Sequence, residues 1–122
     1  MRCVIVDDNA PFLDAARDLL ARQGINVVGL ATTLAEAIQR ADELHPDVML
    51  VDIELGREDG FEVARRVTQA AGSDTPRVVL ISTHAEDDLA ELVASSPAVG
   101  FLSKSDLSRS AIDRLLAGGA SG

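Results

Sequence analysis

Apolar runs and amphipathic stretches alternate along the chain. Runs over residues 3–6, 25–30, 47–51 and 77–81 have the length and composition of buried strands, and residues 99–102 form a shorter fifth run. The stretches between these runs place apolar residues at helical spacing. This alternation predicts an α/β fold, a doubly wound five-stranded parallel sheet with helices on both faces, because parallel strands need crossover connections.

Local signals mark where the first two helices begin and end. Gly24 offers a C-terminal cap to a first helix that contains residues 11–20. Thr33, with Glu36 three residues later, forms a capping-box signature before a second helix, which Pro46 ends.

The later helices carry weaker signals. We expect them at about residues 61–70, at about residues 87–94, and after Ser105, which can cap a last helix. That helix contains four apolar residues: Leu107, Ile112, Leu115 and Leu116. We expect residues 1–117 to form one domain and the Gly-rich residues 118–122 to be a tail or the start of a linker.

Composition narrows the classes of partner. The 122 residues include three Phe and no Trp or Tyr, so Val, Leu, Ile and Ala must build the core. Eleven basic and 20 acidic residues give a net charge of −9, which argues against direct nucleic-acid binding and against an anionic membrane surface. The single cysteine, Cys3, reads as a small buried apolar residue. Without a membrane-spanning run or a signal-peptide pattern, we expect a cytoplasmic location.

Polar side chains follow four of the five predicted strands. Asp7 and Asp8 follow the first strand, Asp52 the third, Ser82 the fourth and Lys104 the fifth. Ligands of doubly wound sheets bind beyond the carboxyl ends of the strands, so we expect these side chains to share one site. Three carboxylates placed so close together need a raised pKa or a cation, and Mg²⁺ prefers oxygen ligands. The lysine and the serine hydroxyl could then surround a phosphoryl group.

Each of these residues also has a simpler interpretation. Asp7 and Asp8 could be a solvated turn before a helix, and Asp52 a turn residue. Ser82 could satisfy local backbone groups, and Lys104 could lie on a solvated rim. Their joint placement at one edge of the sheet is what favours a functional site.

The sequence resembles the receiver domain of bacterial two-component response regulators over nearly its whole length. The resemblance rests on Asp7 and Asp8, on Asp52 in "VMLVDIELGREDG", on Ser82 in "VVLISTHAE" and on Lys104 in "VGFLSKS". The last four of these residues are separated by 44, 30 and 22 residues, as in that family. The resemblance implies a flavodoxin-like (βα)5 fold with strand order 2-1-3-4-5, and a phosphoprotein of two-component, phosphorelay signal transduction.

The resemblance also implies a role for each acidic residue. Asp52 would be the phosphoacceptor, which takes a phosphoryl group from a partner histidine kinase. Asp8 would bind Mg²⁺ directly, together with Asp52 and the backbone carbonyl of Glu54, while Asp7 would act mostly through metal-bound water.

The remaining implied roles concern the response to phosphorylation. Ser82 and Lys104 would bind the phosphoryl oxygens, and Phe101 occupies the position of the family's switch aromatic, although it could equally be a plain core residue. The surface formed by the fourth helix, the fifth strand and the fifth helix would then change, for homodimerisation or output. We expect an effect on transcription, and no enzyme activity beyond the protein's own phosphorylation and dephosphorylation.

The sequence departs from the commonest family pattern at several positions. Ser105 follows Lys104 where many members have proline, and Thr83 stands where a smaller residue is usual. We hypothesise that Glu54 and His84, which flank the pocket, tune the lifetime of the phosphate. We also expect Thr83 to crowd the phosphoryl pocket and so to slow hydrolysis of the phosphate.

Two other functions fit parts of the pattern. A small Mg²⁺-dependent phosphatase of the haloacid-dehalogenase type also uses a strand-end Asp, but its second acid is normally an Asp where this chain has Glu54. A flavodoxin-like flavin carrier needs a Ser/Thr-rich phosphate loop and flat aromatic residues, whereas "DDNAP" is acidic. The segment "GFLSKSDL" also resembles receivers that precede a LuxR-type helix-turn-helix domain.

Overall fold

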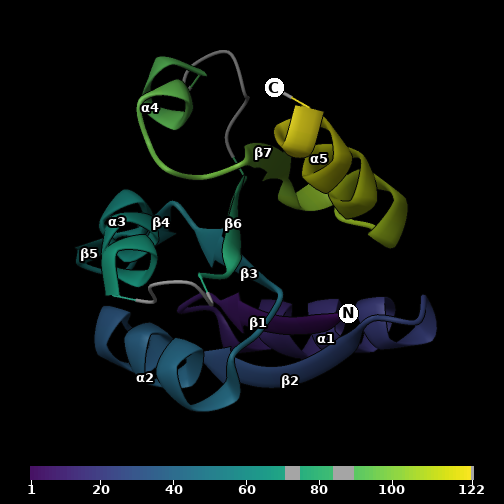
Figure 1. The fold of residues 1–122 in the computed structure, drawn as a ribbon. Coiled ribbons are helices and arrows are strands. Elements are labelled where there is room, and N and C mark those ends of the chain that lie inside the picture. Colours follow the sequence, from purple (N-terminus) through teal and green to yellow (C-terminus); the bar gives the residue numbers. More distant parts are fainter. Residues whose placement is uncertain (71–74, 84–89, 122) are drawn as a thin grey trace.

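The computed structural model describes residues 1–70, 75–83 and 90–121, and its elements alternate as the sequence predicts (Figure 1). The strands are β1 (Arg2–Val6), β2 (Asn26–Ala31), β3 (Val48–Asp52), β4 (Glu54–Leu55), β5 (Glu58–Asp59), β6 (Arg77–Ser82) and β7 (Gly100–Ser103). The helices are α1 (Ala10–Arg22), α2 (Leu34–Leu44), α3 (Gly60–Ala70), α4 (Ala90–Ala94), the short 3₁₀ helix η3 (Lys104–Asp106) and α5 (Arg109–Ser121).

Within the described residues, five parallel strands form one sheet in the order β2-β1-β3-β6-β7. Numbered as five predicted strands, this is the order 2-1-3-4-5, so the predicted flavodoxin-like fold is confirmed. The order reverses between β1 and β3, which places the carboxyl ends of these two strands side by side.

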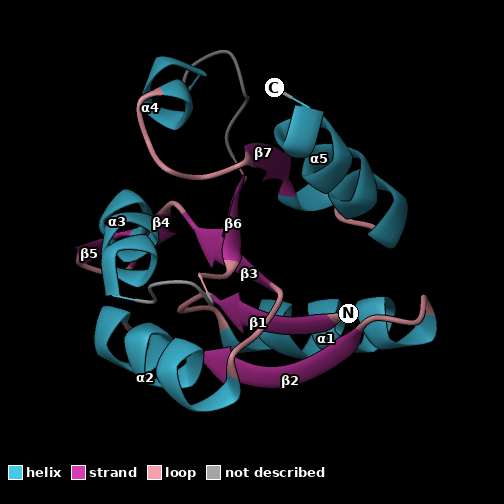
Figure 2. Cartoon of the chain, in the orientation of Figure 1, coloured by secondary structure: helices cyan, strands magenta, loops and turns pink. Residues whose placement is uncertain are grey.

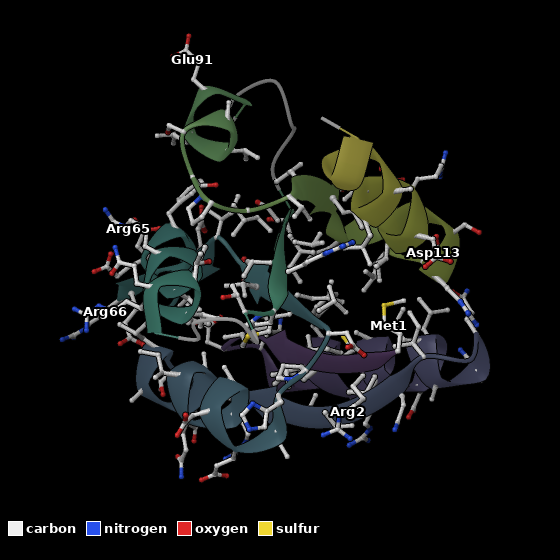
Figure 3. The ribbon with its side chains drawn as sticks, in the orientation of Figure 1. Met1, Arg2, Arg65, Arg66, Glu91 and Asp113 are labelled. Atoms are coloured by element: carbon white, nitrogen blue, oxygen red, sulfur yellow. The ribbon has the colours of Figure 1, made fainter. Side chains whose placement is uncertain are left out.

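Apolar side chains of alternate strand positions build two cores, one on each face of the sheet. Helices cover both of these faces (Figure 2). The first core packs the sheet against α2, α3 and α4. The second packs it against α1 and α5. Charged side chains such as Arg65, Arg66, Glu91 and Asp113 project outward from the helices (Figure 3).

Capping explains the ends of the first two helices. Gly24, with a φ of 90°, follows the C-cap of α1 as predicted. At α2, the backbone N–H of Glu36 donates to Thr33 Oγ1 over 3.1 Å. The Glu36 carboxylate accepts from the backbone and hydroxyl of Thr32 instead of from Thr33, so the capping box is displaced by one residue.

The C-terminal helix differs from its prediction at both ends. Ser105 lies inside η3, and it is Ser108 that caps α5, its Oγ accepting a hydrogen bond from Ala111 N over 3.1 Å. The helix α5 continues to Ser121. It therefore includes residues 118–121, which we expect from the sequence to belong to a tail or linker. A domain boundary at residue 117 stays a prediction.

The segment between β3 and α3 forms the antiparallel hairpin β4–β5, where the sequence suggested only a loop. Its turn contains Gly56, whose φ of 61° lies in the left-handed region. Two-residue strands are too short to leave a periodic signal in the sequence. The described residues contain no helix with the length and apolar character needed to cross a membrane.

Candidate functional site

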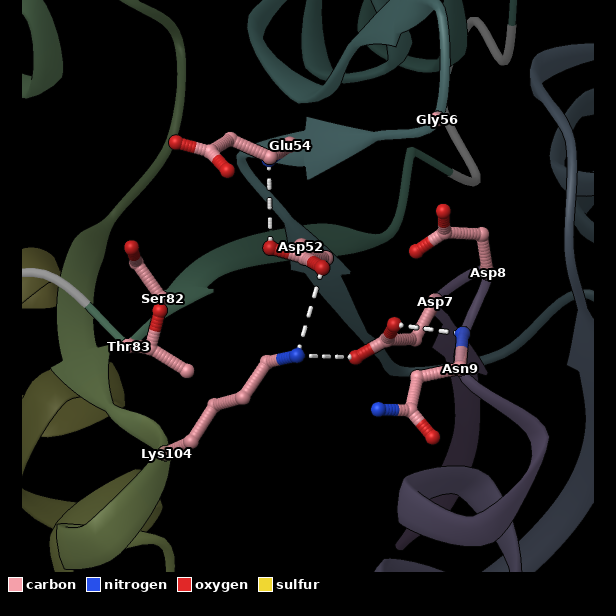
Figure 4. Close-up of a pocket in the computed structure, with 9 residues that line it drawn as sticks. All are labelled: Asp7, Asp8, Asn9, Asp52, Glu54, Gly56, Ser82, Thr83 and Lys104. Atoms are coloured by element: carbon pink, nitrogen blue, oxygen red, sulfur yellow. Dashed lines mark hydrogen bonds and ion pairs between the residues drawn. The ribbon is translucent and has the colours of Figure 1, made fainter.

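The carboxyl ends of β1, β3, β6 and β7 bring the predicted site residues into one pocket (Figure 4). Asp7 and Asp8 follow β1, and Asp52 and Ser82 are the last residues of β3 and β6. Ligand atoms of Asp7, Asp8 and Asp52 all lie within 4.8 Å of one another. The wall of the pocket consists of Asp7, Asp8, Asn9, Asp52, Glu54, Gly56, Ser82, Thr83 and Lys104.

Lys104 provides the positive charge at the centre of this pocket. Its Nζ lies 2.6 Å from Asp7 Oδ2 and 3.2 Å from Asp52 Oδ2. Asp7 is fully buried and Asp52 is 6% exposed, so both pairs are shielded from water. Lys104 is the only lysine in the 122 residues. It reaches both carboxylates although Ser105 replaces the proline that is common after this lysine.

Backbone amides fix the two buried carboxylates from the other side. The N–H of Asn9 donates to Asp7 Oδ1 over 2.9 Å, and the N–H of Glu54 donates to Asp52 Oδ1 over 3.1 Å. Each carboxylate thus has one oxygen held by the backbone and the other turned toward Lys104, as Figure 4 shows.

The pocket carries more negative than positive charge, and this perturbs its pKa values. Burial, and then the charge of Asp7, raise the pKa of Asp52 to about 6, against the opposing effects of the Glu54 amide and Lys104. Burial alone would lower the pKa of Lys104, but its ion pairs with Asp7 and Asp52 outweigh burial and raise the pKa. Three carboxylates facing one ammonium leave a site that favours a further cation.

Gly60 lets α3 begin directly against the phosphoacceptor candidate. A Cβ atom at Gly60 would lie 2.1 Å from the backbone oxygen of Asp52, closer than any side chain could approach. Gly60 therefore allows the close packing that holds the end of β3. In the sequence, a glycine that opens a helix soon after the candidate acid is the signal that could have identified this close packing.

The other predicted site residues occupy different environments. Ser82 is buried in the wall of the pocket, whereas Thr83 is exposed at its rim. Phe101 is 7% exposed and packs in the core on the α2, α3 and α4 side. A switching role for Phe101 stays a prediction, and His84 lies outside the described residues.

Comparison with known proteins identifies relatives that match most of the chain. The model of the response regulator receiver domain matches residues 3–115. A protein-glutamate methylesterase/protein-glutamine glutaminase of Myxococcus xanthus is 33% identical over 106 residues, which cover 85% of this chain and 30% of that protein. The DNA-binding transcriptional activator EvgA of Escherichia coli is 26% identical over 106 residues, which cover 87% of this chain and 51% of EvgA. The chain thus spans 30% of the length of the first relative and about half of the length of the second.

Solved structures give the same result for the fold. The receiver domain of the putative response regulator NarL from Mycobacterium tuberculosis has a TM-score of 0.79 and 34% identity, covering 99% of this chain and 96% of that one. A LuxR-family two-component response regulator from Aurantimonas has a TM-score of 0.83 and 26% identity, covering 98% of this chain and 85% of the other.

The methylesterase relatives correct one expectation. From the sequence, we expected a protein with no enzyme activity beyond its own phosphorylation and dephosphorylation. That expectation is wrong, because several relatives that match this chain are named as enzymes. Since the match covers about 30% of those proteins, the methylesterase name describes the relatives as whole proteins.

Proposed function

Because this chain belongs to the response regulator receiver domain family, we propose that it is a phosphoacceptor switch that takes a phosphoryl group onto Asp52. The observation that carries the proposal is the position of Asp52, a buried carboxylate at a strand end, 3.2 Å from the only lysine and beside two further carboxylates. A histidine kinase is the proposed phosphoryl donor.

The residues of the pocket fit a hard divalent cation. Asp7, Asp8 and Asp52 offer carboxylate oxygens within 4.8 Å of one another. Asp7 Oδ2 accepts no hydrogen bond of regular geometry from any described residue, although Lys104 Nζ is 2.6 Å away. We propose that Asp8, Asp52 and the Glu54 carbonyl bind Mg²⁺ directly and that Asp7 acts through its water. Bound Mg²⁺ would supply positive charge to the phosphoryl oxygens.

Asp52 supplies the nucleophile in this proposal. One of its carboxylate oxygens forms the new O–P bond, while the P–N bond of the donor phosphohistidine breaks and the imidazole leaves with the bonding electron pair. Lys104 and the Ser82 hydroxyl stabilise the charge of the transferred phosphoryl group, because they stand at adjacent strand ends of the same pocket. The product is an aspartyl phosphate.

The output follows from how that phosphate is bound. Ser82 is the last residue of β6, and Lys104 directly follows β7. A phosphate that binds both side chains therefore favours one arrangement of the loops that follow these two strands. Phe101, in β7, would transmit the change to the face formed by α4, β7 and α5. We propose that this face serves homodimerisation or output to transcription, in line with the name of the EvgA relative and with a likeness to LuxR-family regulators. Direct nucleic-acid binding by this segment and membrane association are not part of the proposal, given the net charge of −9.

The function is tested by incubating the chain with acetyl phosphate and following its intact mass. In Mg²⁺ we expect one phosphoryl group per chain, and in excess EDTA none. Steady turnover of a phosphate ester such as p-nitrophenyl phosphate, without a phosphorylated chain, would instead identify the phosphatase alternative.

Glu54 is proposed to shorten the lifetime of the aspartyl phosphate, since its exposed side chain adds negative charge at the pocket rim. We expect Glu54→Gln to prolong the half-life of the phosphorylated chain roughly twofold to fivefold, the range of an exposed charge interaction. The measurement is the decay of the phosphorylated mass after acetyl phosphate is removed. Glu43→Gln, on the exposed surface of α2, is the control, and equal half-lives for both variants and the wild type would refute the role of Glu54. A matching role for His84 is tested by the same decay in His84→Ala.

A further inference from the structure

The aromatic ring of Phe12 lies against the ammonium group of Lys104. The Lys104 Nζ is 4.4 Å from the centroid of the Phe12 ring, within the distance at which a cation and a ring face attract each other. Phe12 is one of only three aromatic residues in the chain, and Lys104 is the only lysine. Neither the sequence pattern nor the resemblance drew attention to Phe12.

A closed set of contacts places this ring. Phe12 lies in the first turn of α1, and its backbone N–H donates to the side chain of Asn9 over 3.1 Å. The backbone N–H of Asn9 donates to Asp7 Oδ1 over 2.9 Å, and Asp7 Oδ2 pairs with Lys104. The carboxylate, the helix cap, the ring and the ammonium therefore hold one another in position.

A second cavity adjoins the Lys104 side chain, and the Phe12 ring forms part of its wall. Phe12, Ser103 and Ser105 line a cavity that shares Asn9, Thr83 and Lys104 with the main pocket. The lysine side chain thus separates two open spaces, and its own side chain is 14% exposed. Without the ring, the ammonium would have room to turn away from Asp52 into this second cavity.

We propose that Phe12 is a positioning residue, whose ring face keeps the Lys104 ammonium directed at Asp52 for phosphoryl transfer. The ring suits this task because it attracts the ammonium without carrying a charge, unlike the neighbouring carboxylates of Asp7 and Asp52. Its attraction does not change when Asp52 exchanges its free carboxylate for an aspartyl phosphate. The inference rests on the proposed function and adds a residue to it.

The kinetic test compares three variants for labelling by acetyl phosphate in saturating Mg²⁺. We expect Phe12→Leu to lower the initial rate about threefold to tenfold, the equivalent of one cation–π contact, while Phe12→Tyr, which keeps a ring, stays within about twofold of the wild type. Phe61→Leu is the matched control, because Phe61 is equally half-buried but packs on the other face of the sheet. Equal rates for Phe12→Leu and the wild type, or equal losses in Phe12→Leu and Phe61→Leu, would overturn the inference.

The spectroscopic test uses the single lysine, which gives one set of side-chain signals after ¹³C-lysine labelling. We expect the ε-methylene signal of the wild type to be shifted upfield by the ring, to stay so in Phe12→Tyr, and to return toward that of a free lysine in Phe12→Leu. The wild-type signal tests the contact even if a variant does not fold, and an unshifted signal there overturns the inference. A ring-shifted signal in a wild-type protein that acetyl phosphate does not label would overturn the proposed function alone.

Discussion

Replacement of Lys104 by methionine is expected to lower the free energy of unfolding by about 3 kcal/mol near pH 7.5 in the absence of divalent cations. Methionine keeps most of the apolar side chain but removes the ammonium that lies 2.6 Å from Asp7 and 3.2 Å from Asp52. Asp7 is fully buried and Asp52 is 6% exposed, so two carboxylates would face each other with little water to screen them. Urea unfolding of the wild type and the variant measures the loss.

Controls separate this effect from a general loss of a surface charge. Arg17→Met removes an exposed cation that pairs with Asp14 over 3.4 Å, and it should change stability by roughly 0.5 kcal/mol or less. Lys104→Arg keeps a charge and should lose less than Lys104→Met. Near pH 4 the loss in Lys104→Met should shrink, because a carboxyl that takes up a proton no longer repels its neighbour. An unchanged urea midpoint for Lys104→Met at pH 7.5 would contradict the assignment of Lys104 as the central counter-charge.

Asp52→Asn is expected to stabilise the metal-free protein near pH 7.5 by about 1 to 2 kcal/mol. The folded protein holds the proton of Asp52 more tightly than the unfolded chain does, because burial and Asp7 raise the pKa of this carboxyl from 3.8 to about 6. The ionised carboxylate therefore costs stability above about pH 6, and this cost fades as the pH falls toward 4. The shift, which already includes the opposing effects of Lys104 and the Glu54 amide, corresponds to about 3 kcal/mol, and the expected gain is smaller because the NH2 group of asparagine cannot accept a hydrogen bond as the replaced carboxylate oxygen does.

The measurement is urea unfolding of the wild type and Asp52→Asn in EDTA across this pH range. The difference should be largest near pH 7.5 and vanish near pH 4. Asp14→Asn, an exposed change on α1, should show no such trend. Saturating Mg²⁺ should stabilise the wild type more than the variant, since only the wild type keeps all three carboxylates. A variant less stable than the wild type in EDTA at pH 7.5 would contradict the charge balance inferred for the pocket.

The sequence was sufficient to predict those features that repeat or that sit at strand ends. Long apolar runs such as residues 47–51 locate central strands, because both faces of a parallel sheet are buried. Once the strands are placed, the edge shared by Asp7, Asp8, Asp52 and Lys104 follows from the topology.

Features decided by single contacts could not be predicted in this way. Ser105 and Ser108 are equally good capping residues in the sequence, and only the turn η3 after β7 makes Ser108 the one that caps α5. The hairpin β4–β5 is too short and polar to leave a pattern. The contact between Phe12 and Lys104 joins residues 92 positions apart, and the helical spacing around Phe12 gives no sign of it.

The central claim is that Asp52 accepts the phosphoryl group, and the most direct test is to locate that group after labelling by acetyl phosphate in Mg²⁺. Reduction of the phosphorylated chain with borohydride converts an aspartyl phosphate to homoserine, which peptide mass spectrometry can place. The wild type should carry homoserine at Asp52, and Asp52→Asn should take up no phosphoryl group. Labelling of Asp52→Asn to the wild-type level, or homoserine at Asp7 or Asp8 in the wild type, would contradict the account.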